Sequence, residues 1–296
     1  MTFQQMQYVL EVYRAGSVSA AAKKLFVGQP SISLCISSLE KELGYQVFHR
    51  VKDGVVPTPR GREVINQAAR ICESYRIITA PEQTGSTKNC SAGGNSSFCR
   101  KAALRLLEEN ADRTDVYFQF AETGRLPALQ QVALFEIDLF LKFGFTHEMH
   151  QLERQFRERD LQWLELAQFP VAVHLGPGHR LYNADNVDIS MLENDYLIDT
   201  HRKAMATSPV IHSLVPVRPD KVLIVEDLHL RTQLLEKGFG YTVKPMMPHE
   251  KDLFRRIPLG NLSVKFLAIY NPARPMRPEA ARYLELLQEE LKSLGT

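Results

Sequence analysis

The sequence predicts a small, mainly α-helical N-terminal domain, then a linking helix, then a larger α/β region. Two amphipathic helices separated by a tight break lie within residues 16–44, the layout of a helix-turn-helix. Strand-like and helix-like runs alternate from residue 87 onwards, which is typical of an α/β fold. The chain of 296 residues is longer than one typical domain, so both regions fit into it.

The first helix of the pair begins at a serine and is rich in alanine. Either Ser17 or Ser19 is able to cap the free amides at its start, and the strong helix formers of residues 20–25 continue it. Its three alanines, residues 20–22, carry almost no side-chain bulk. A second helix is therefore able to cross close above this one, as a helix-turn-helix requires.

The second helix of the pair is bounded by two glycines. Gly28 suits the N-cap, and Gly44 ends the helix. Pro30 suits the first turn, because its missing N–H would have no partner there. The apolar residues of this helix recur with helical spacing and form one core-facing stripe, which consists of Ile32, Ile36, Leu39 and Leu43.

The opposite side of the second helix carries polar residues and one leucine. Amide, hydroxyl and apolar side chains all read base edges in the major groove, so this side predicts contact with double-stranded DNA. The residues expected in that contact, with the serines that start the preceding helix, are Ser17, Ser19, Gln29, Pro30, Ser31, Ser33, Leu34 and Ser37. An ordinary solvated helix face is the alternative interpretation.

A two-stranded wing is predicted after the second helix. Residues 45–50 and 55–58 have strand character, and residues 52–54 form a turn with glycine. Arg50 and Lys52, near the tip, are placed to contact phosphates beside the groove. The rest of a small core comes from one face of a leading helix, with Phe3, Met6, Leu10 and Tyr13.

In these N-terminal residues the chain resembles the LysR-type transcriptional regulators. The residues that carry the resemblance are, in unbroken order, Gly16, Ser17, Ala21, Ala22, Leu25, Gln29, Pro30, Ser33, Ile36, Leu39, Glu40, Leu43, Gly44, Phe48, Arg50, Thr58 and Gly61. The family usually has an arginine where this chain has Leu34, and a capping serine where it has Gly28. Without that guanidinium a phosphate or guanine contact is lost, so affinity and target sequence do not carry over from relatives.

The charge is unevenly distributed along the chain. Residues 1–70 hold nine of the 36 basic residues and five of the 34 acidic residues, a balance of +4. The remainder holds 27 basic and 29 acidic residues, a balance of −2. A modestly basic N-terminal domain fits a specific DNA reader that also uses shape, although chance asymmetry would give the same numbers.

A linker helix is predicted to follow the wing. Thr58 is able to cap it, with Pro59 at its first position. Its apolar stripe favours a partner helix over a helix that lies on its own domain, and consists of Ile65, Ala68, Cys72 and Tyr75. The resemblance implies the same, since linker helices of the family pair, and so predicts a homodimer or homotetramer. Residues 82–97 are rich in polar and small residues, which indicates a hinge.

The α/β region begins with a strand-helix-strand unit. Strands over residues 116–121 and 137–143, with a helix over 126–135 between them, predict a parallel sheet with a right-handed crossover. The further strands expected are residues 169–174, 196–199 and 222–225, and the further helices are residues 99–110, 228–237 and 278–294.

The resemblance also implies the domain organisation. A winged helix-turn-helix DNA-binding domain spans residues 1–58, and the linker helix with its hinge spans 59–86. Residues 87–296 form a periplasmic-binding-protein-like effector domain of two Rossmann-like subdomains. The first subdomain consists of residues 87–162 and 267–296, and the second of residues 163–266. In the family a small-molecule effector binds between them.

Polar residues at strand ends and before a helix are candidates to bind that effector. In open α/β sheets, ligands bind beyond the carboxyl ends of the strands, where helix N-termini present amides to an anion. The candidates are Asn95, Ser96, Ser97, Thr123, Thr200 and His201. Helix capping alone would explain each serine or threonine, but convergence from separate strands favours a site for an anionic effector. No cofactor is expected besides this small molecule.

Other functions find less support in the sequence. It contains no nucleophile elbow, phosphate-binding loop or Rossmann glycine fingerprint, so no enzyme activity is expected. His147 and His150 have a metal-ligand spacing but no third ligand, so no metal site is expected. Of the four cysteines, Cys90 and Cys99 form a candidate redox pair. The alternative function is therefore a ligand-binding or redox-sensing protein whose DNA-binding domain is weakened.

The expected location is the cytoplasm. The chain has no apolar run of the roughly 18 residues that a membrane helix needs, and its first residues do not read as a signal peptide. No membrane partner is expected. RNA polymerase is a further candidate partner of a transcriptional regulator.

Overall fold

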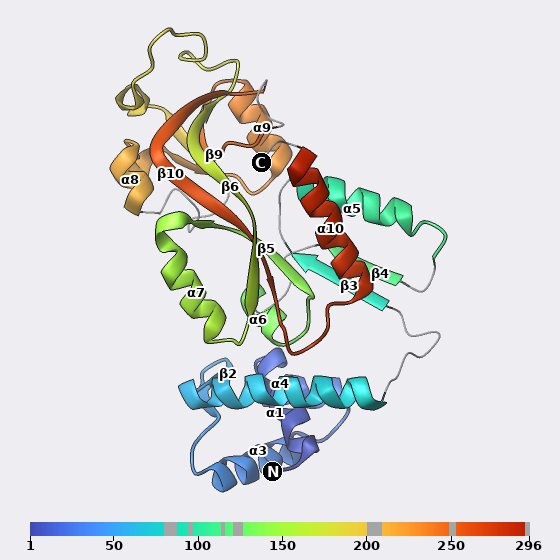
Figure 1. Ribbon diagram of the computed structural model, residues 1–296. Coiled ribbons are helices and arrows are strands. Elements are labelled where there is room, and N and C mark those ends of the chain that lie inside the picture. Colours follow the sequence, from blue (N-terminus) through green and yellow to red (C-terminus); the bar gives the residue numbers. More distant parts are fainter. Residues whose placement is uncertain are drawn as a thin grey trace. The chain divides into compact units, whose positions relative to one another are not determined.

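The computed structural model describes residues 1–79, 88–93, 97–113, 116–120, 127–199, 209–248 and 253–293 (Figure 1). The chain divides into two compact units. The first consists of Met1–Lys142, His150–Leu164 and Leu267–Glu290, and the second of Phe143–Met149, Glu165–Phe266 and Leu291–Thr296. The domain limits expected from the sequence stay predictions.

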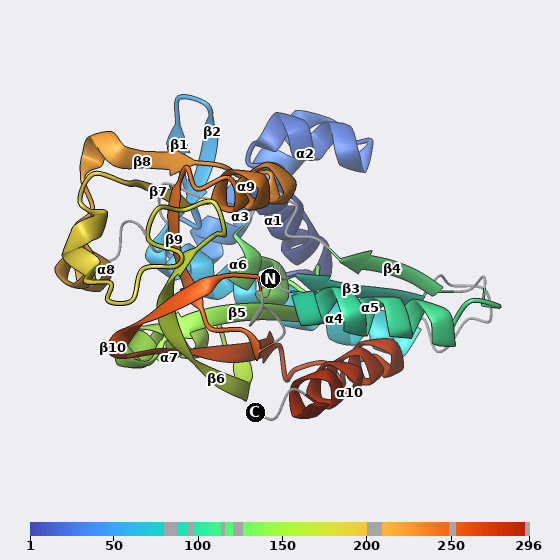
Figure 2. The same ribbon diagram turned by 90° about the horizontal axis from the view of Figure 1, so that it is seen from above.

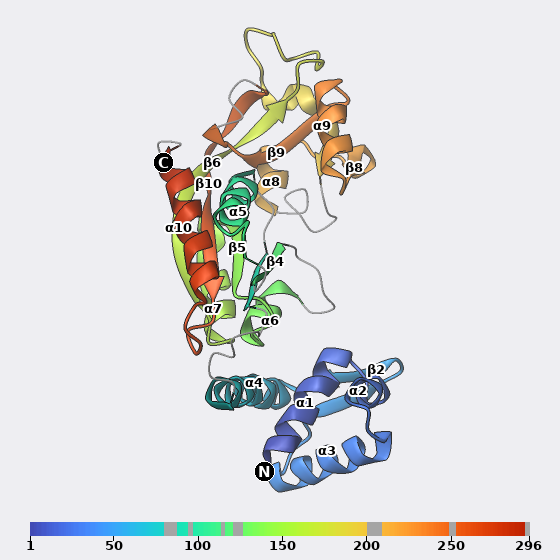
Figure 3. The ribbon, with the colours of Figure 1, turned by 90° about the vertical axis from the view of Figure 1, so that its right-hand side faces the viewer.

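The N-terminal part of the first unit is a helix-turn-helix with a wing, followed by a long helix (Figure 3). Its elements are α1 (Phe3–Ala15), α2 (Val18–Leu25), α3 (Gln29–Leu43), β1 (Phe48–Val51), β2 (Gly54–Pro57) and α4 (Pro59–Thr79). The turn chemistry is the one expected: Ser17 caps α2, and Gly44 ends α3 in the left-handed conformation at φ 77°. Thr58 caps α4 by accepting a hydrogen bond from the Gly61 amide at 2.8 Å.

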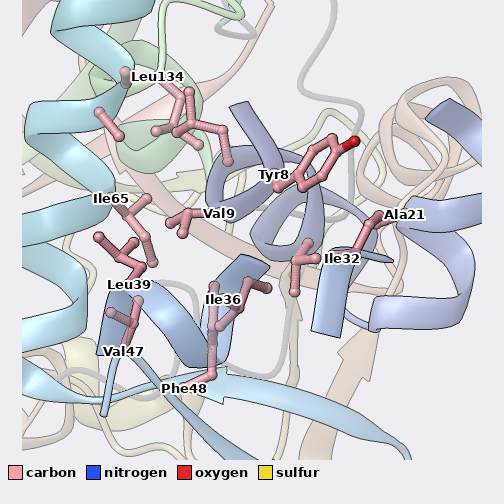
Figure 4. Close-up of a cluster of buried hydrophobic side chains, with 14 of the residues drawn as sticks. Tyr8, Val9, Ala21, Ile32, Ile36, Leu39, Val47, Phe48, Ile65 and Leu134 are labelled. Atoms are coloured by element: carbon pink, nitrogen blue, oxygen red, sulfur yellow. The ribbon is translucent and has the colours of Figure 1, made fainter. Parts of the chain in front are cut away.

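One apolar core holds these helices together (Figure 4). Val9 from α1, Ile32 from α3 and Val47 before the wing are all fully buried, and Ile65 from α4 is 1% exposed. The stripe at Ile32, Ile36 and Leu39 therefore faces the core as the sequence spacing predicts. Phe3 and Tyr75 add a ring contact between α1 and α4, with centroids 4.3 Å apart.

Three neighbouring strands of the first unit are parallel to one another. They are β3 (Lys88–Gly93), β4 (Val116–Phe120) and β5 (Leu139–Phe145), in the order β4-β3-β5. The two strands predicted from the sequence are parallel, but β3 lies between them. The expectation of a hinge over all of residues 82–97 is wrong for residues 88–93, because pairing with two long-range neighbours makes a strand from a polar, low-propensity segment.

Helices α5 (Ser97–Glu109) and α10 (Pro278–Ser293) lie side by side in the first unit (Figures 1 and 2). Two ion pairs join them: Arg105 to Glu289 at 2.6 Å and Arg282 to Glu109 at 2.7 Å. The unit also contains α6 (Ala128–Ala133) and most of α7 (Met149–Arg157). Helix α10 is therefore joined to a helix from a distant part of the chain, since Arg105 and Glu289 are 184 residues apart.

The second unit is a mixed sheet. Its strands include most of β6 (Gln162–Leu175) and β10 (Arg255–Tyr270), each of which passes from one unit into the other, with β7 (Tyr196–Asp199), β8 (Val222–Ile224) and β9 (Gly240–Pro245). β9 is antiparallel to β6 and parallel to β7, which is parallel to β8. Helices α8 (Pro209–Leu214) and α9 (Leu228–Glu236) complete it, with short 3₁₀ turns at Thr146–Glu148, Ile189–Leu192 and Pro219–Lys221.

Candidate nucleic-acid interface

Helix α3 is positioned by the packing of its apolar side close to the alanines of α2. Ala21 is fully buried and Ala22 is 4% exposed, and Ile32 and Leu39 pack in the same core (Figure 4). Because alanine carries only a methyl group, the two helices approach closely and the angle between them is held by contact rather than by a long side chain. The outer side of α3 is therefore presented by a rigid support.

The outer side of α3 is polar except for Pro30 and Leu34. Ser33 is half-buried, and Leu34 is 72% exposed. The other candidate DNA contacts on this helix are exposed, namely Gln29, Pro30, Ser31 and Ser37. No lysine or arginine occurs in α3 before Lys41 in the last turn. This surface offers hydroxyl, amide and apolar groups to a DNA groove, but no cation.

The start of α3 has no side-chain cap. Gly28 is the N-cap residue at φ −68° and ψ 135°, and no side chain accepts a hydrogen bond from the first turn. The amides of a helix start carry partial positive charge and bind phosphate well. In this turn Pro30 has no N–H and the Ser31 amide donates to the Gly28 carbonyl at 3.1 Å, so few amides are left for a phosphate.

The two serines of α2 have different surroundings. Ser17 Oγ accepts a hydrogen bond from the Ala20 amide at 3.1 Å, so its oxygen holds the helix start. Ser19 is exposed, with its Oγ 3.4 Å from that of Ser17. Of this pair, Ser19 is the one whose hydroxyl is presented to an approaching ligand, while the role of both in DNA contact stays a prediction.

The wing is hydrogen-bonded to the helical part of the domain at the start of its first strand and near its tip. Glu40 of α3 accepts hydrogen bonds from the amides of Val47 at 2.7 Å and Phe48 at 3.2 Å. The Val55 amide donates to the Gly16 carbonyl at 2.9 Å. At Gly54 a Cβ atom would lie 2.2 Å from that same carbonyl, so only glycine fits this close approach.

The tip of the wing carries the positive charge that α3 lacks. Arg50 and Lys52 are exposed, and no ion pair of either one occurs among the described residues. Lys23 on α2 is exposed as well, whereas Lys24 pairs with Glu11 at 2.7 Å. The exposed cations of the wing and the polar side chains of α3 thus lie on two elements that the Glu40 hydrogen bonds hold together.

The candidate effector residues lie almost entirely outside the described part of the chain. Asn95, Ser96, Thr123, Thr200 and His201 are all outside the described residues, and Ser97 is the first residue of α5. Phe143 of β5 stacks on Phe266, with ring centroids 4.6 Å apart. That contact supports core packing for Phe143.

Burial favours the protonated, unreactive thiol at two of the described cysteines. Burial raises the pKa of the Cys35 thiol, and burial raises the pKa of Cys72 against the opposing charge of Arg14. Cys99 is buried in α5, and its carbonyl accepts a hydrogen bond from the Tyr283 hydroxyl at 3.2 Å. The side chain of Cys90 lies outside the described residues, so the redox pair stays untested.

Two further features bear on other functions. Within the described ranges, no three His, Cys, Asp or Glu residues gather in a way that would hold a metal ion. His147 instead lies 3.6 Å from Glu148. None of the described helices combines the length and the hydropathy needed to cross a membrane.

Sequence reasoning missed a buried charge cluster where α4 meets the rest of the first unit. Arg274 donates to Glu73 of α4 at 3.1 Å and to Asp138 before β5, and Arg277 lies 3.6 Å from Asp138. The side chains of Arg274, Asp138 and Glu73 are 8%, 3% and 10% exposed. Burial raises the pKa of Glu73, but hydrogen bonds from Arg76 and Arg274 outweigh it, so the pKa is lowered. Spacing carries no signal here, since Glu73 and Arg274 are 201 residues apart.

Comparisons with known proteins identify both parts of the chain. Residues 3–62 match the profile described as bacterial regulatory helix-turn-helix protein, lysR family, and residues 99–292 match the LysR substrate binding domain. The small neutral protease regulatory protein of Streptomyces coelicolor is 26% identical over 191 residues, which is 62% of this chain and 59% of that protein. The aligned part thus spans less than two thirds of this curated relative.

Two solved structures share the fold along the whole chain. LysG from Corynebacterium glutamicum, solved with the bound effector Arg, has a TM-score of 0.64 at 15% identity and 99% coverage of both chains. Full-length OxyR C199D from Pseudomonas aeruginosa has a TM-score of 0.62 at 18% identity, covering 99% of this chain and 98% of that one. The two profile matches together cover most of the sequence. They show that the chain belongs to the LysR family of bacterial regulators.

Proposed function

We propose that the protein is a sequence-specific DNA-binding transcriptional regulator whose activity depends on a small-molecule effector. The observation that carries this proposal is the exposed polar side of α3, which Glu40 fastens to a wing that carries the exposed Arg50 and Lys52. In this proposal α3 enters the major groove and the wing contacts the phosphates that flank it. An enzyme activity is not proposed, since the family's members are regulators.

The regulator acts as a homodimer or homotetramer in this proposal. The stripe expected to meet a partner helix faces this domain's own core instead, because Ile65 and Ala68 are only 1% and 2% exposed and Cys72 packs beside them. The side of α4 that stays exposed carries Ile71, Tyr75 and Ile78, with exposed fractions of 41%, 50% and 76%. Burying such a stripe against the same helix of a second copy would remove it from water and place two reading helices on one DNA site. A site with two-fold symmetry is then expected, because each half-site meets one copy.

The effector is expected in the substrate-binding domain that residues 99–292 match. The candidates Asn95, Ser96, Ser97, Thr123, Thr200 and His201 would contribute hydroxyls, an amide and an imidazole to a polar head group. Ser97 opens the 13-residue helix α5, whose free amides favour an anion. LysG, which shares the fold, was solved with the effector Arg, a molecule that carries a carboxylate.

Anisotropy titration of labelled promoter fragments tests the DNA-binding part of the proposal. Binding should be tighter to the fragment next to the protein's own gene than to a scrambled fragment, and it should weaken as salt rises. Ser33→Ala and Arg50→Ala should both weaken it, and Arg50→Ala should also reduce the salt dependence, because it removes a phosphate contact. Equal affinity for the promoter and scrambled fragments would rule out a sequence-specific regulator.

The alternative is a ligand-binding or redox-sensing protein with a weakened DNA-binding domain. Leu34 and the absence of lysine or arginine from the first turns of α3 are the observations that favour it. A thermal-shift panel of metabolites separates the two functions when it is combined with the DNA titration, because the alternative predicts ligand stabilisation without promoter binding. As a regulator, the protein would work in the cytoplasm on its DNA, with RNA polymerase as a further candidate partner.

A further inference from the structure

Leu34 is the one exposed apolar side chain on the outer side of α3 beyond its first turn, where Pro30 lies. It is 72% exposed and does not belong to the apolar core. Ile32 and Ile36, two residues before and two after it, are buried, and two residues correspond to more than half a helical turn. Leu34 therefore points away from the core, and its neighbours one turn away, Ser31 and Ser38, are exposed.

A leucine at this place has one favourable contact in a DNA groove. Its side chain has no hydrogen-bond donor or acceptor, so it gains nothing from the polar atoms of base edges. The major groove offers a single apolar feature, the C5-methyl group of thymine. Serine hydroxyls beside it bond equally well to several bases, so they do not distinguish thymine from the other bases.

No long cation next to Leu34 competes for the same base. Lys41 is two turns further along α3, and the cations of the wing, Arg50 and Lys52, lie on a separate element. Arginine in this position would reach the guanine acceptors O6 and N7 and would favour a G·C pair. We infer that Leu34 reads the methyl group of a thymine, so that this chain prefers an A·T pair at that position. The inference rests on the proposed DNA-binding function and specifies its target.

Deoxyuridine provides the test, because it differs from thymidine only by the missing methyl group. Each thymine of the bound promoter site is replaced in turn, and the affinity of the full-length protein is measured by anisotropy. We expect one position in each half-site where the replacement weakens wild-type binding about fourfold, the effect of one buried methyl-sized group. The same replacement should change the affinity of Leu34→Ala by less than about 1.5-fold.

Two further arms sharpen the result. A C·G pair at that position should weaken wild-type binding, and 5-methylcytosine in the same pair should restore part of the loss, because the methyl group returns without the thymine. Leu34→Arg should prefer guanine there. Leu214→Ala, which truncates an exposed leucine at the end of α8, is the matched control and should keep the wild-type sensitivity to deoxyuridine.

The outcomes separate this inference from the function on which it rests. If Leu34→Ala keeps the full deoxyuridine sensitivity while the promoter is still bound specifically, Leu34 is not the methyl reader and the inference is overturned. If the wild-type protein binds promoter and scrambled DNA equally, the proposed regulator function fails and the inference fails with it. Leu34→Ala should melt at the wild-type temperature, since an exposed side chain is truncated.

Discussion

The cap and turn contacts of the helix-turn-helix and wing reach less far along the chain than the polar contacts of the α/β region. In the helix-turn-helix and wing, Glu40 bonds to the amide of Val47, seven residues away, and Thr58 caps α4 through Gly61. In the α/β region, Asn271 bonds to the Ala133 carbonyl across 138 residues. Local contacts leave periodic signals in a sequence, whereas contacts between distant segments leave none.

The largest expected effect tests a long-range contact. Arg274→Ala removes the partner that Asp138 and Glu73 share and leaves each buried carboxylate with one other arginine, Arg277 or Arg76, so we expect the free energy of unfolding to fall by about 3 kcal/mol. Denaturant unfolding followed by Trp163, the single tryptophan of the chain, measures this change.

The control for Arg274 is an arginine whose ion pair is exposed. Arg218→Ala breaks the pair with Asp220, in which the side chains are 44% and 61% exposed, so little change is expected. Equal effects of the two variants would show that the buried cluster contributes no more than a surface pair. The long-range contacts of Arg274 would then not be a major source of stability in the α/β region.

A smaller effect concerns pH and the second unit. Burial, with the charges of Lys244 and Arg256, lowers the pKa of His174 to about 3. Because the folded-state pKa is below the ordinary value of 6.5, the folded protein binds fewer protons than the unfolded chain, and stability falls as pH drops from about 6.5 towards 3. Between pH 6.5 and 5 the loss should be about 2 kcal/mol.

Circular dichroism melts at several pH values measure this loss. His174→Gln should lose less stability on acidification than the wild type, because glutamine does not titrate. His229→Gln, at an exposed histidine of α9, is the control and should follow the wild-type profile. A wild-type profile that stays flat between pH 6.5 and 5 would contradict a buried neutral imidazole at His174.

The smallest effect tests the local turn chemistry of the helix-turn-helix. Phe26, between α2 and α3, is 95% exposed at φ 55°, a left-handed conformation that costs an L-residue with a bulky side chain. Phe26→Asn should stabilise the protein by about 0.5–1 kcal/mol, because asparagine tolerates this conformation.

The matched control removes an exposed phenylalanine elsewhere. Phe239 is 55% exposed and does not have a positive φ, so Phe239→Asn should bring no gain. The melting temperatures of the two variants give the comparison. A gain at both positions would mean that losing an exposed aromatic ring, and not the backbone conformation, is responsible.

Much of the helix-turn-helix and wing is predictable from the sequence. The caps at Ser17 and Gly28, the stop at Gly44 and the core stripe of α3 follow from helical spacing and terminal residues, and the structure confirms them. Their direct contacts to DNA stay predictions. In the α/β region, β7 was predicted with its correct bounds, whereas β3 was missed, because its strand state comes from pairing with β4 and β5.

The sequence by itself determined where the helices of the reading domain begin and end, which side of α3 is polar, and that Leu34 stands among serines on that side. These properties depend on residues within a few turns of one another. Only the tertiary structure decided that β3 lies between β4 and β5 and that Glu73 shares Arg274 with Asp138. The physical reason is that sheet pairing and buried charge neutralisation join segments whose separation along the chain has no periodicity.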